Sequence, residues 1–282
     1  MISPEQVAAA GQLACLLEVS AAKPGNVSPE RHFHDTRYED FLASAVAIGP
    51  ALAEAGRHPL GSTVRRAVED TLRWTRSNTN LGIVLLLAPI AKAALGAGES
   101  LRGCLKTVLA TTTVEDAAQV YAAIRRARPG GLGRSPEEDV AAAPSVTLHQ
   151  AMALAATRDA IAREYVSEFE YTFEIGVPAV LAARQAGLPW TEAAIEAYLA
   201  LLEAVPDTHI ARKLGSAEAE AVSRSAREVR RLGGTRSAAG QQALSNLDRA
   251  LRDERNRRNP GTTADLTCAA LLVVILEGGW DR

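Results

Sequence analysis

The chain has 282 residues, of which 47% are hydrophobic, 23% are charged and only 4% are aromatic, and its formal net charge is -2. A nearly neutral chain lacks the positive field that recruits nucleic acid, and its longest apolar run, residues 81–91, is too short to cross a bilayer. Three widely spaced cysteines show no metal or disulfide pattern, and residues 1–5 do not resemble a signal peptide, so a cytoplasmic protein is expected.

Composition and helix signals together predict an all-α fold. Alanine, the best helix former, is abundant, whereas the aromatic residues that strands favour are scarce. Capping-box patterns predict helix starts, in chain order, at Ser3, Thr36, Thr113 and Thr147. A buried helix is expected to begin near Asn80, with a kink or break at Pro89.

The second half of the chain shows the same helical pattern. Helices are expected near residues 159–186, 191–204, 216–232 and 237–257, and the last helix begins at Thr262 or Thr263. The Pro129–Gly133 loop is the best internal boundary, but helical pattern continues on both sides of it. We therefore expect one compact domain over residues 1–282, with about ten or more helices.

Two polar loops in the first forty residues are candidates for a site. In Lys23-Pro24-Gly25-Asn26, the glycine lets the backbone approach a ligand closely and the lysine offers a charge for phosphate. The alternative is a turn that ends a helix. The cluster His32-Phe33-His34-Asp35 has residues suited to metal binding or acid–base chemistry, while Asp35 is also a plausible helix cap.

Two further loops precede strongly apolar helices, and helix N-termini attract anions. One is Ser77-Asn78-Thr79-Asn80-Leu81-Gly82, whose two asparagines exceed what a helix cap needs. The other is Asn259-Pro260-Gly261-Thr262-Thr263-Ala264-Asp265, where Asp265 suits a Mg²⁺ ion that bridges phosphate oxygens. Simple helix capping remains the alternative for both loops.

The loops also form an ordered set with two other turns. The chain carries, in order, Lys23-Pro24-Gly25, Asn78-Thr79, Glu174-Ile175-Gly176-Val177-Pro178, Asp207-Thr208-His209 and Pro260-Gly261-Thr262-Thr263-Ala264-Asp265-Leu266. This set, spread from residue 18 to residue 276, resembles the motifs of the triphosphoribosyl-dephospho-CoA synthase family. Each motif alone is weak, but their order is fairly specific. The chain departs from the family at Asn80-Leu81, where synthases read His-Lys, and at His209, where they read Asn. Neither change is conservative.

The resemblance implies an all-α transferase that uses ATP as a substrate. It would release adenine and join the 5-triphosphoribosyl group to a hydroxyl of 3′-dephospho-CoA. The positions that the resemblance and the loop chemistry assign to nucleotide and phosphate binding are Lys23, Gly25, Asn26, Asn78, Thr79, Asn80, Gly261, Thr262 and Thr263. Three carboxylates, Asp265, Glu174 and Asp207, are assigned to Mg²⁺ or to the oxocarbenium-like ribose, with His34 as a further acid–base candidate.

The departures leave two alternatives open. One keeps the ribosyl transfer but changes the acceptor to a precursor of tetrahydromethanopterin, a pterin carrier of one-carbon units. The other is a nucleotide-binding protein without catalysis, since a possible acid and a phosphate contact are missing at Asn80-Leu81. Hydrolysis of an ADP-ribosyl-type bond is a third, weaker alternative that rests on fold analogy and chemistry alone. Small-molecule substrates are expected in every case, and the apolar last helix would allow a homodimer.

Overall fold

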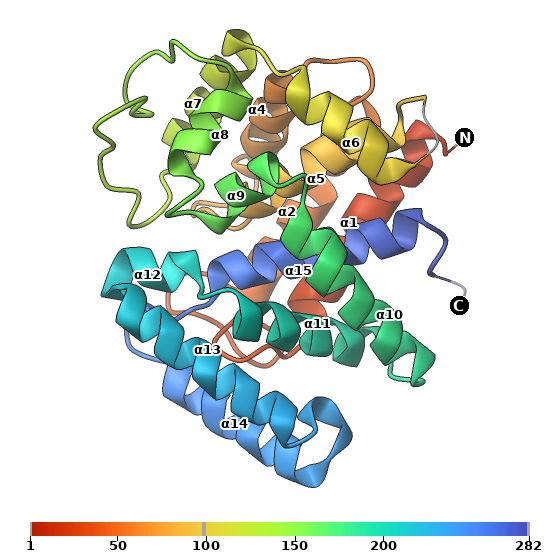
Figure 1. The fold of residues 1–282 in the computed structure, drawn as a ribbon, viewed down its shortest axis with the longest axis vertical. Helices are drawn as coiled ribbons and strands as arrows, with labels where there is room; N and C mark the ends of the chain where they lie inside the picture. The colour runs from red at the N-terminus through yellow and green to blue at the C-terminus, as the bar shows by residue number, and fades with distance from the viewer. Residues whose placement is uncertain (1, 98–99, 281–282) are drawn as a thin grey trace. The chain divides into compact units, whose positions relative to one another are not determined.

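The computed structural model describes residues 2–97 and 100–280, and it confirms the predicted all-α fold (Figure 1). No strand forms within these residues, where Ser28 and Arg31 make an isolated β-bridge. The α-helices are α1 (Pro4–Ser20), α2 (Tyr38–Ala47), α3 (Gly49–Ala53), α4 (Leu60–Thr71), α5 (Leu81–Ala94), α6 (Leu101–Ala110), α7 (Val114–Ala127), α8 (Leu148–Ala155), α9 (Ala160–Val166), α10 (Val177–Gln185), α11 (Trp190–Ala204), α12 (Thr208–Leu214), α13 (Ser216–Arg231), α14 (Ala238–Leu251) and α15 (Gly261–Leu276). A π-helical turn, η1 (Thr172–Gly176), and a 3₁₀ turn, η2 (Gly234–Arg236), complete the described elements.

The chain divides into two compact units. The first unit is Met1–Cys15 with Glu39–Phe169, and the second unit is Leu16–Tyr38 with Glu170–Arg282. The boundary in the middle of the chain therefore follows Phe169, and the predicted boundary at the Pro129–Gly133 loop is wrong. A single domain over residues 1–282 stays a prediction. None of the described helices has the length and apolarity needed to cross a membrane.

Local capping explains most helix starts. The predicted capping boxes at Thr113 and Thr147 are both present, and Ser3 exchanges hydrogen bonds with Gln6 as the pattern requires. At Thr36 the prediction is wrong by one residue, because an N-cap at Thr36 would start the helix at Arg37, whereas α2 begins at Tyr38. The carbonyl of Thr36 accepts a hydrogen bond from the Phe33 amide, so Thr36 belongs to a preceding turn.

Two predicted long helices are interrupted. The helix expected over residues 159–186 breaks after α9, because Glu168 and Phe169 adopt left-handed backbone conformations with φ of 56° and 60°. The helix expected over residues 237–257 ends at Leu251, where Arg252 is extended. The last helix, α15, begins at Gly261 after Pro260, one residue before the predicted start.

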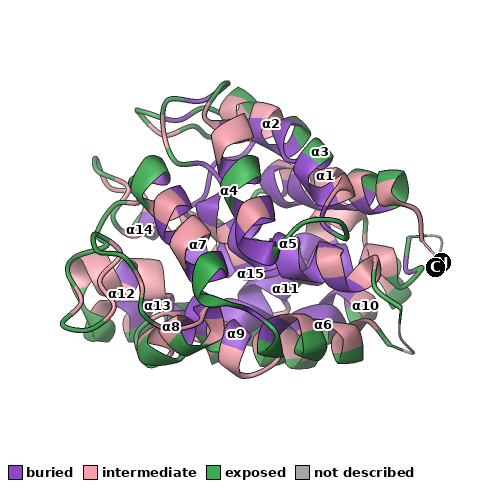
Figure 2. Cartoon of the chain, turned by 90° about the horizontal axis from the view of Figure 1, so that it is seen from above, coloured by how far each residue is buried: buried purple, intermediate pink, exposed green. Residues whose placement is uncertain are grey.

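Helix α5 is the core element of the first unit and is buried around most of its circumference (Figure 2). Pro89 lies inside it, yet the helix continues from Leu81 to Ala94, so the predicted break is absent. A proline has no N–H to donate to the carbonyl four residues earlier, which here belongs to Leu85. The buried hydroxyl of Tyr165 donates to that carbonyl at 2.7 Å and replaces the missing helix bond.

Helices α11 and α15 form the core of the second unit, and both are buried along most of their length (Figure 2). The π-helical turn η1 packs against both of them. Its Gly176 makes this packing possible, because a Cβ there would lie 2.7 Å from the Cβ of Ala270. The glycine of the motif Glu174-Ile175-Gly176-Val177-Pro178 thus allows close helix packing.

The Tyr165–Leu85 hydrogen bond gives a test of how α5 tolerates its proline. Replacing Tyr165 by Phe leaves a buried carbonyl without a donor, so we expect a loss of about 1–3 kcal/mol in the free energy of unfolding. In a Pro89→Ala background the restored amide satisfies the same carbonyl, and the loss on Tyr165→Phe should shrink. Urea denaturation of the four proteins of this double-mutant cycle measures the coupling. Equal losses in both backgrounds would contradict this account.

Candidate functional site

The second unit holds a buried carboxylate that caps two helices at once. Asp207 is 1% exposed, and its Oδ1 accepts the amide of Ile210 at 3.0 Å in the first turn of α12. Its Oδ2 accepts the amide and the hydroxyl of Thr263, both at 2.8 Å, in the first turn of α15. Burial raises the pKa of Asp207, while these hydrogen bonds and the nearby Arg212 act in the opposite direction. Asp207 therefore fixes the two helix starts relative to each other.

Several polar groups of the two motifs meet at this junction. The hydroxyl of Thr208 donates to that of Thr262 at 3.1 Å. The imidazole of His209 lies beside Gly261. A Cβ atom added to Gly261 would be 3.5 Å from two ring atoms of His209 and 3.6 Å from the side-chain nitrogen of Asn259. The Oδ1 atom of Asn259 is buried and has no hydrogen-bond partner in the described chain. A buried acceptor of this kind calls for a donor from a ligand or a water molecule.

His209 is neutral at physiological pH. Burial, together with the charges of Lys213 and Arg212, lowers its pKa from 6.5 to about 3. A neutral imidazole carries one N–H donor and one acceptor nitrogen. The motif position thus offers hydrogen bonds and not a positive charge.

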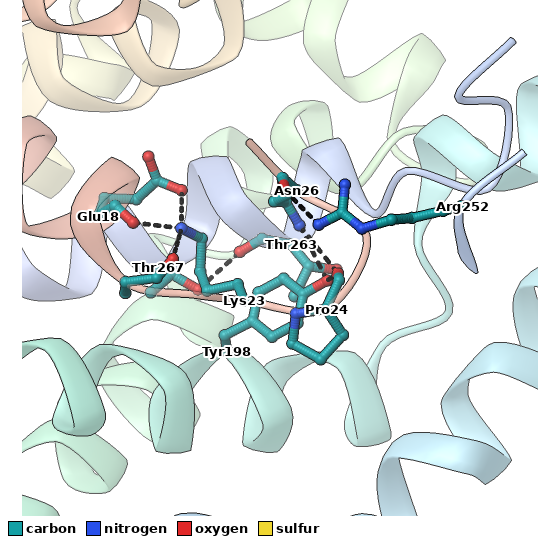
Figure 3. A network of polar contacts seen from close by, with 9 residues as sticks. Glu18, Lys23, Pro24, Asn26, Tyr198, Arg252, Thr263 and Thr267 are labelled. Carbon is teal, nitrogen blue, oxygen red and sulfur yellow. Dashed lines mark hydrogen bonds and ion pairs between the residues drawn. The ribbon is translucent and has the colours of Figure 1, made fainter. Parts of the chain in front are cut away.

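The Lys-Pro-Gly loop is stabilised by the buried side chain of its own lysine, as Figure 3 shows. The Lys23 side chain is 0% exposed and pairs with Glu18 of the last turn of α1 at 2.9 Å. Its ammonium also donates to the carbonyl of Ala21 at 3.2 Å and to the carbonyl of Glu18. An ammonium has three N–H bonds, and all three have acceptors here. A phosphate contact by Lys23, as the sequence predicted, would require this buried pair to open.

Gly25 and Asn26 complete the same loop. Gly25 has a φ of +74°, and a Cβ there would lie 2.9 Å from Leu251 and 3.1 Å from Pro260. Only glycine fits both restrictions. The side chain of Asn26 donates to the hydroxyl of Tyr198 at 3.0 Å and to the carbonyl of Pro24 at 3.3 Å (Figure 3). Both motif residues therefore shape the loop.

The segment between α14 and α15, residues 252–260, joins the loops of the second unit. Arg252 donates to the carbonyl of Asn26 at 2.9 Å, and Pro260 lies against Gly25. The exposed His34 lies 3.3 Å from the side-chain amide of Asn256. The structure thus brings together four regions singled out in the sequence: residues 23–26, 32–35, 207–209 and 259–263.

The Asn-Thr segment belongs to the first unit, where it caps and anchors α5. The side chain of Asn78 accepts the amide of Leu81 at 3.0 Å. Thr79 shares a hydrogen bond with Ser44 at 2.6 Å, and Asn80 donates to Thr71 at 3.1 Å. Thr79 and Asn80 are buried, whereas Asn78 is exposed. Of the three predicted nucleotide contacts, only Asn78 presents its side chain to solvent.

The other predicted carboxylates lie on the helices that meet at the core of the second unit. Glu174 is exposed on η1, and Asp265 is half-buried on α15, one turn after Gly261. No three His, Cys, Asp or Glu residues in the described chain form a group that could hold a metal ion. Both oxygens of Asp207 already accept hydrogen bonds from the starts of α12 and α15, and a role of Asp265, Glu174 and Asp207 in binding Mg²⁺ stays a prediction.

The buried pair offers the first test of this geometry. Lys23→Met leaves Glu18 buried without its partner, so we expect a loss of about 3–5 kcal/mol in the free energy of unfolding. The double variant Lys23→Met with Glu18→Leu removes both charges and should recover most of that loss. Guanidinium denaturation measures each protein. A stable Lys23→Met variant that has lost only ATP binding would instead support the phosphate role.

The second test uses the pH dependence of stability. The unfolded chain protonates His209 near pH 6.5, but the folded chain does so only near pH 3. The unfolded state therefore binds more protons between these values, and the free energy of unfolding falls by up to about 1.4 kcal/mol per pH unit as the pH drops. Asp207, whose pKa is raised, makes the free energy of unfolding rise as the pH drops. Both the parent and the His209→Asn variant contain Asp207, so its contribution cancels when the two pH profiles are compared. The variant should lose less stability than the parent between pH 6.5 and pH 4, and identical profiles would contradict a neutral buried His209.

Comparisons with known proteins agree with the resemblance found in the motifs. A probable 2-(5''-triphosphoribosyl)-3'-dephosphocoenzyme-A synthase of Stutzerimonas stutzeri is 27% identical over 97% of this chain and 94% of its own length. A protein of the same name from Pseudomonas paraeruginosa is 33% identical over 37% of this chain and 36% of its own length. A crystal structure described as a "putative triphosphoribosyl-dephospho-coA synthase from Archaeoglobus fulgidus" is similar with a TM-score of 0.66 and 28% identity, covering 84% of this chain and 99% of that one.

The family match extends over almost the whole sequence and therefore includes both compact units. It covers residues 4–282 and contains every motif that carried the resemblance. The chain belongs to the ATP:dephospho-CoA triphosphoribosyl transferase family and is an enzyme of the ribosyl transferase type.

Proposed function

We propose that this enzyme transfers the 5-triphosphoribosyl group of ATP to a hydroxyl of 3′-dephospho-CoA and releases adenine. The observation that carries the proposal is the junction that Asp207 makes between α12 and α15. It gathers the hydroxyls of Thr208 and Thr262, the neutral ring of His209 and the unsatisfied Oδ1 of Asn259. These groups can form hydrogen bonds with the hydroxyls and ring nitrogens of a nucleoside. The family to which the chain belongs uses ATP, which contains such a nucleoside.

The chemistry requires a carboxylate near C1 of the ribose. Positive charge develops on the sugar as adenine leaves, and the acceptor hydroxyl then attacks C1 and gives up its proton. We assign the charge-stabilising role to Asp265, which lies one helical turn after Gly261 and therefore shares its face of α15. Glu174 on η1 is the second candidate, as that turn packs against α15. Asp207 is a positioning residue in this scheme, because its oxygens hold the helices.

The triphosphate is carried through the reaction without being broken. We place it at the start of α15, where helix geometry directs backbone amides and a partial positive charge outward. Thr262 and Gly261 are the proposed contacts, while Thr263 already donates its amide and hydroxyl to Asp207. Mg²⁺ enters as part of the substrate complex with ATP. A Mg²⁺ ion bound in this way would neutralise part of the phosphate charge and would need few protein ligands.

Release of free adenine is the direct test. Purified enzyme incubated with ATP, Mg²⁺ and 3′-dephospho-CoA should form adenine and a triphosphoribosylated product in equal amounts, measured by mass spectrometry. Asp265→Asn should lower kcat by about a hundredfold or more, because an amide cannot stabilise the developing positive charge. Glu220→Gln, which changes an exposed carboxylate on α13, is the control and should retain activity.

The same assay separates the alternatives. ADP or AMP formed without adenine would overturn the proposed transfer, and ATP binding without turnover would indicate a protein that only binds the nucleotide. Adenine released only with a pterin precursor as acceptor would retain the ribosyl transfer and change the substrate. A homodimer and a cytoplasmic location stay predictions from the sequence.

A further inference from the structure

Lys213 is a half-buried lysine that the motifs do not include. It lies on α12, one turn after His209. Within residues 2–97 and 100–280, its ammonium makes neither a hydrogen bond nor an ion pair, and its surroundings are felt only as longer-range charges. Burial and the neighbouring charge of Arg212 lower its pKa. The ammonium is not among the buried atoms that lack a hydrogen-bond partner in the described chain, so solvent reaches it and an anion can reach it as well.

The carboxylates around Lys213 do not supply that anion. Asp207, Asp253 and Asp35 all act on it electrostatically. Asp207 is occupied as the cap of two helices. Asp253 accepts two backbone amides and pairs with Arg257 at 3.4 Å. Asp35 is 59% exposed, and its nearer contacts are His34 at 3.8 Å and the hydroxyl of Thr36 at 3.2 Å. Each of these carboxylates has partners closer than Lys213.

The location of Lys213 connects it with the nucleotide cluster. Its charge acts on His209, whose ring lies beside Gly261 at the start of α15. Arg212 and Lys213 together place two cations at the end of α12, next to groups suited to a sugar and a base. His209 adds no charge, because it is neutral, so Arg212 and Lys213 supply the positive charge for an anion at this end of α12.

We propose that Lys213 binds a phosphate group of a substrate. The inference rests on the proposed function for its choice of ligand, because both substrates of that reaction carry phosphates. The donor brings a triphosphate and the acceptor brings a diphosphate bridge. Lysine suits either one, since its ammonium is a compact charge with three donors.

The experiment measures binding by isothermal titration calorimetry, with inorganic triphosphate, ATP and 3′-dephospho-CoA as separate probes. Lys213→Met removes the charge and keeps most of the side-chain volume, and Lys213→Arg keeps the charge. We expect Lys213→Met to weaken the Kd of the phosphate-bearing substrate about tenfold to a hundredfold. Lys213→Arg should recover most of the affinity. Lys106→Met is the matched control, because Lys106 is exposed and pairs with Glu168 at 2.7 Å, and it should change no Kd.

The pattern of losses identifies the phosphate. Weaker binding of inorganic triphosphate and ATP assigns Lys213 to the donor, and weaker binding of 3′-dephospho-CoA alone assigns it to the acceptor. If all three Kd values stay within twofold of the parent, or if the parent binds none of the probes, the proposal is overturned. A loss that appears equally in Lys213→Arg, with a lower melting temperature, overturns it as well.

The outcome can also be separated from that of the proposed function. Lys213-dependent binding of inorganic triphosphate by an enzyme that releases no adenine would support the phosphate site and refute the transfer reaction.

Discussion

The second unit depends on one buried carboxylate. Asp207 has lost its water, and this loss alone would favour the protonated form. Three donors from α12 and α15 offset part of that cost, and both helix starts carry a partial positive charge that favours an anion. The consequence is geometric, because two turns about fifty residues apart in the sequence are held in one register. His209 and Thr208 follow Asp207 directly, while Gly261 and Thr262 precede Thr263, so the carboxylate sets the spacing of the whole cluster.

The loops that resemble the family motifs were interpreted from the sequence as ligand contacts, but much of their polarity points inward. The buried side chains of Lys23, Asn26, Thr79 and Asn80 all bond within the chain. A loop that leaves a helix exposes carbonyls and amides that need partners, and a motif can meet this need as well as bind a substrate. Gly25 shows the same point, since its positive φ and its contacts with Leu251 and Pro260 restrict it to glycine. These motif residues fix the backbone of their own loops.

What could be predicted depended on the range of the interactions involved. The all-α class and the caps at Thr113 and Thr147 follow from signals within a few residues. The continuity of α5 could not be predicted, because the donor that replaces the missing amide at Pro89 comes from Tyr165, far along the chain. Burial is equally non-local. It places Lys23 in an ion pair with Glu18, and it leaves Lys213, which lies outside the motifs, without a hydrogen bond or ion pair in the part of the chain that the structure describes.

The departure at His209 has a milder chemical meaning than the sequence suggested. An asparagine amide presents a donor and an acceptor, and so does a neutral imidazole. Because burial keeps the pKa of His209 near 3, the chain preserves the hydrogen-bonding character of the family's Asp-Thr-Asn turn without adding a charge. The charge of Lys213 helps to maintain this state. A phosphate bound to Lys213 would offset that charge and raise the pKa of His209, so substrate binding would bring the imidazole closer to accepting a proton. The substitution therefore keeps the hydrogen-bonding capacity of this turn.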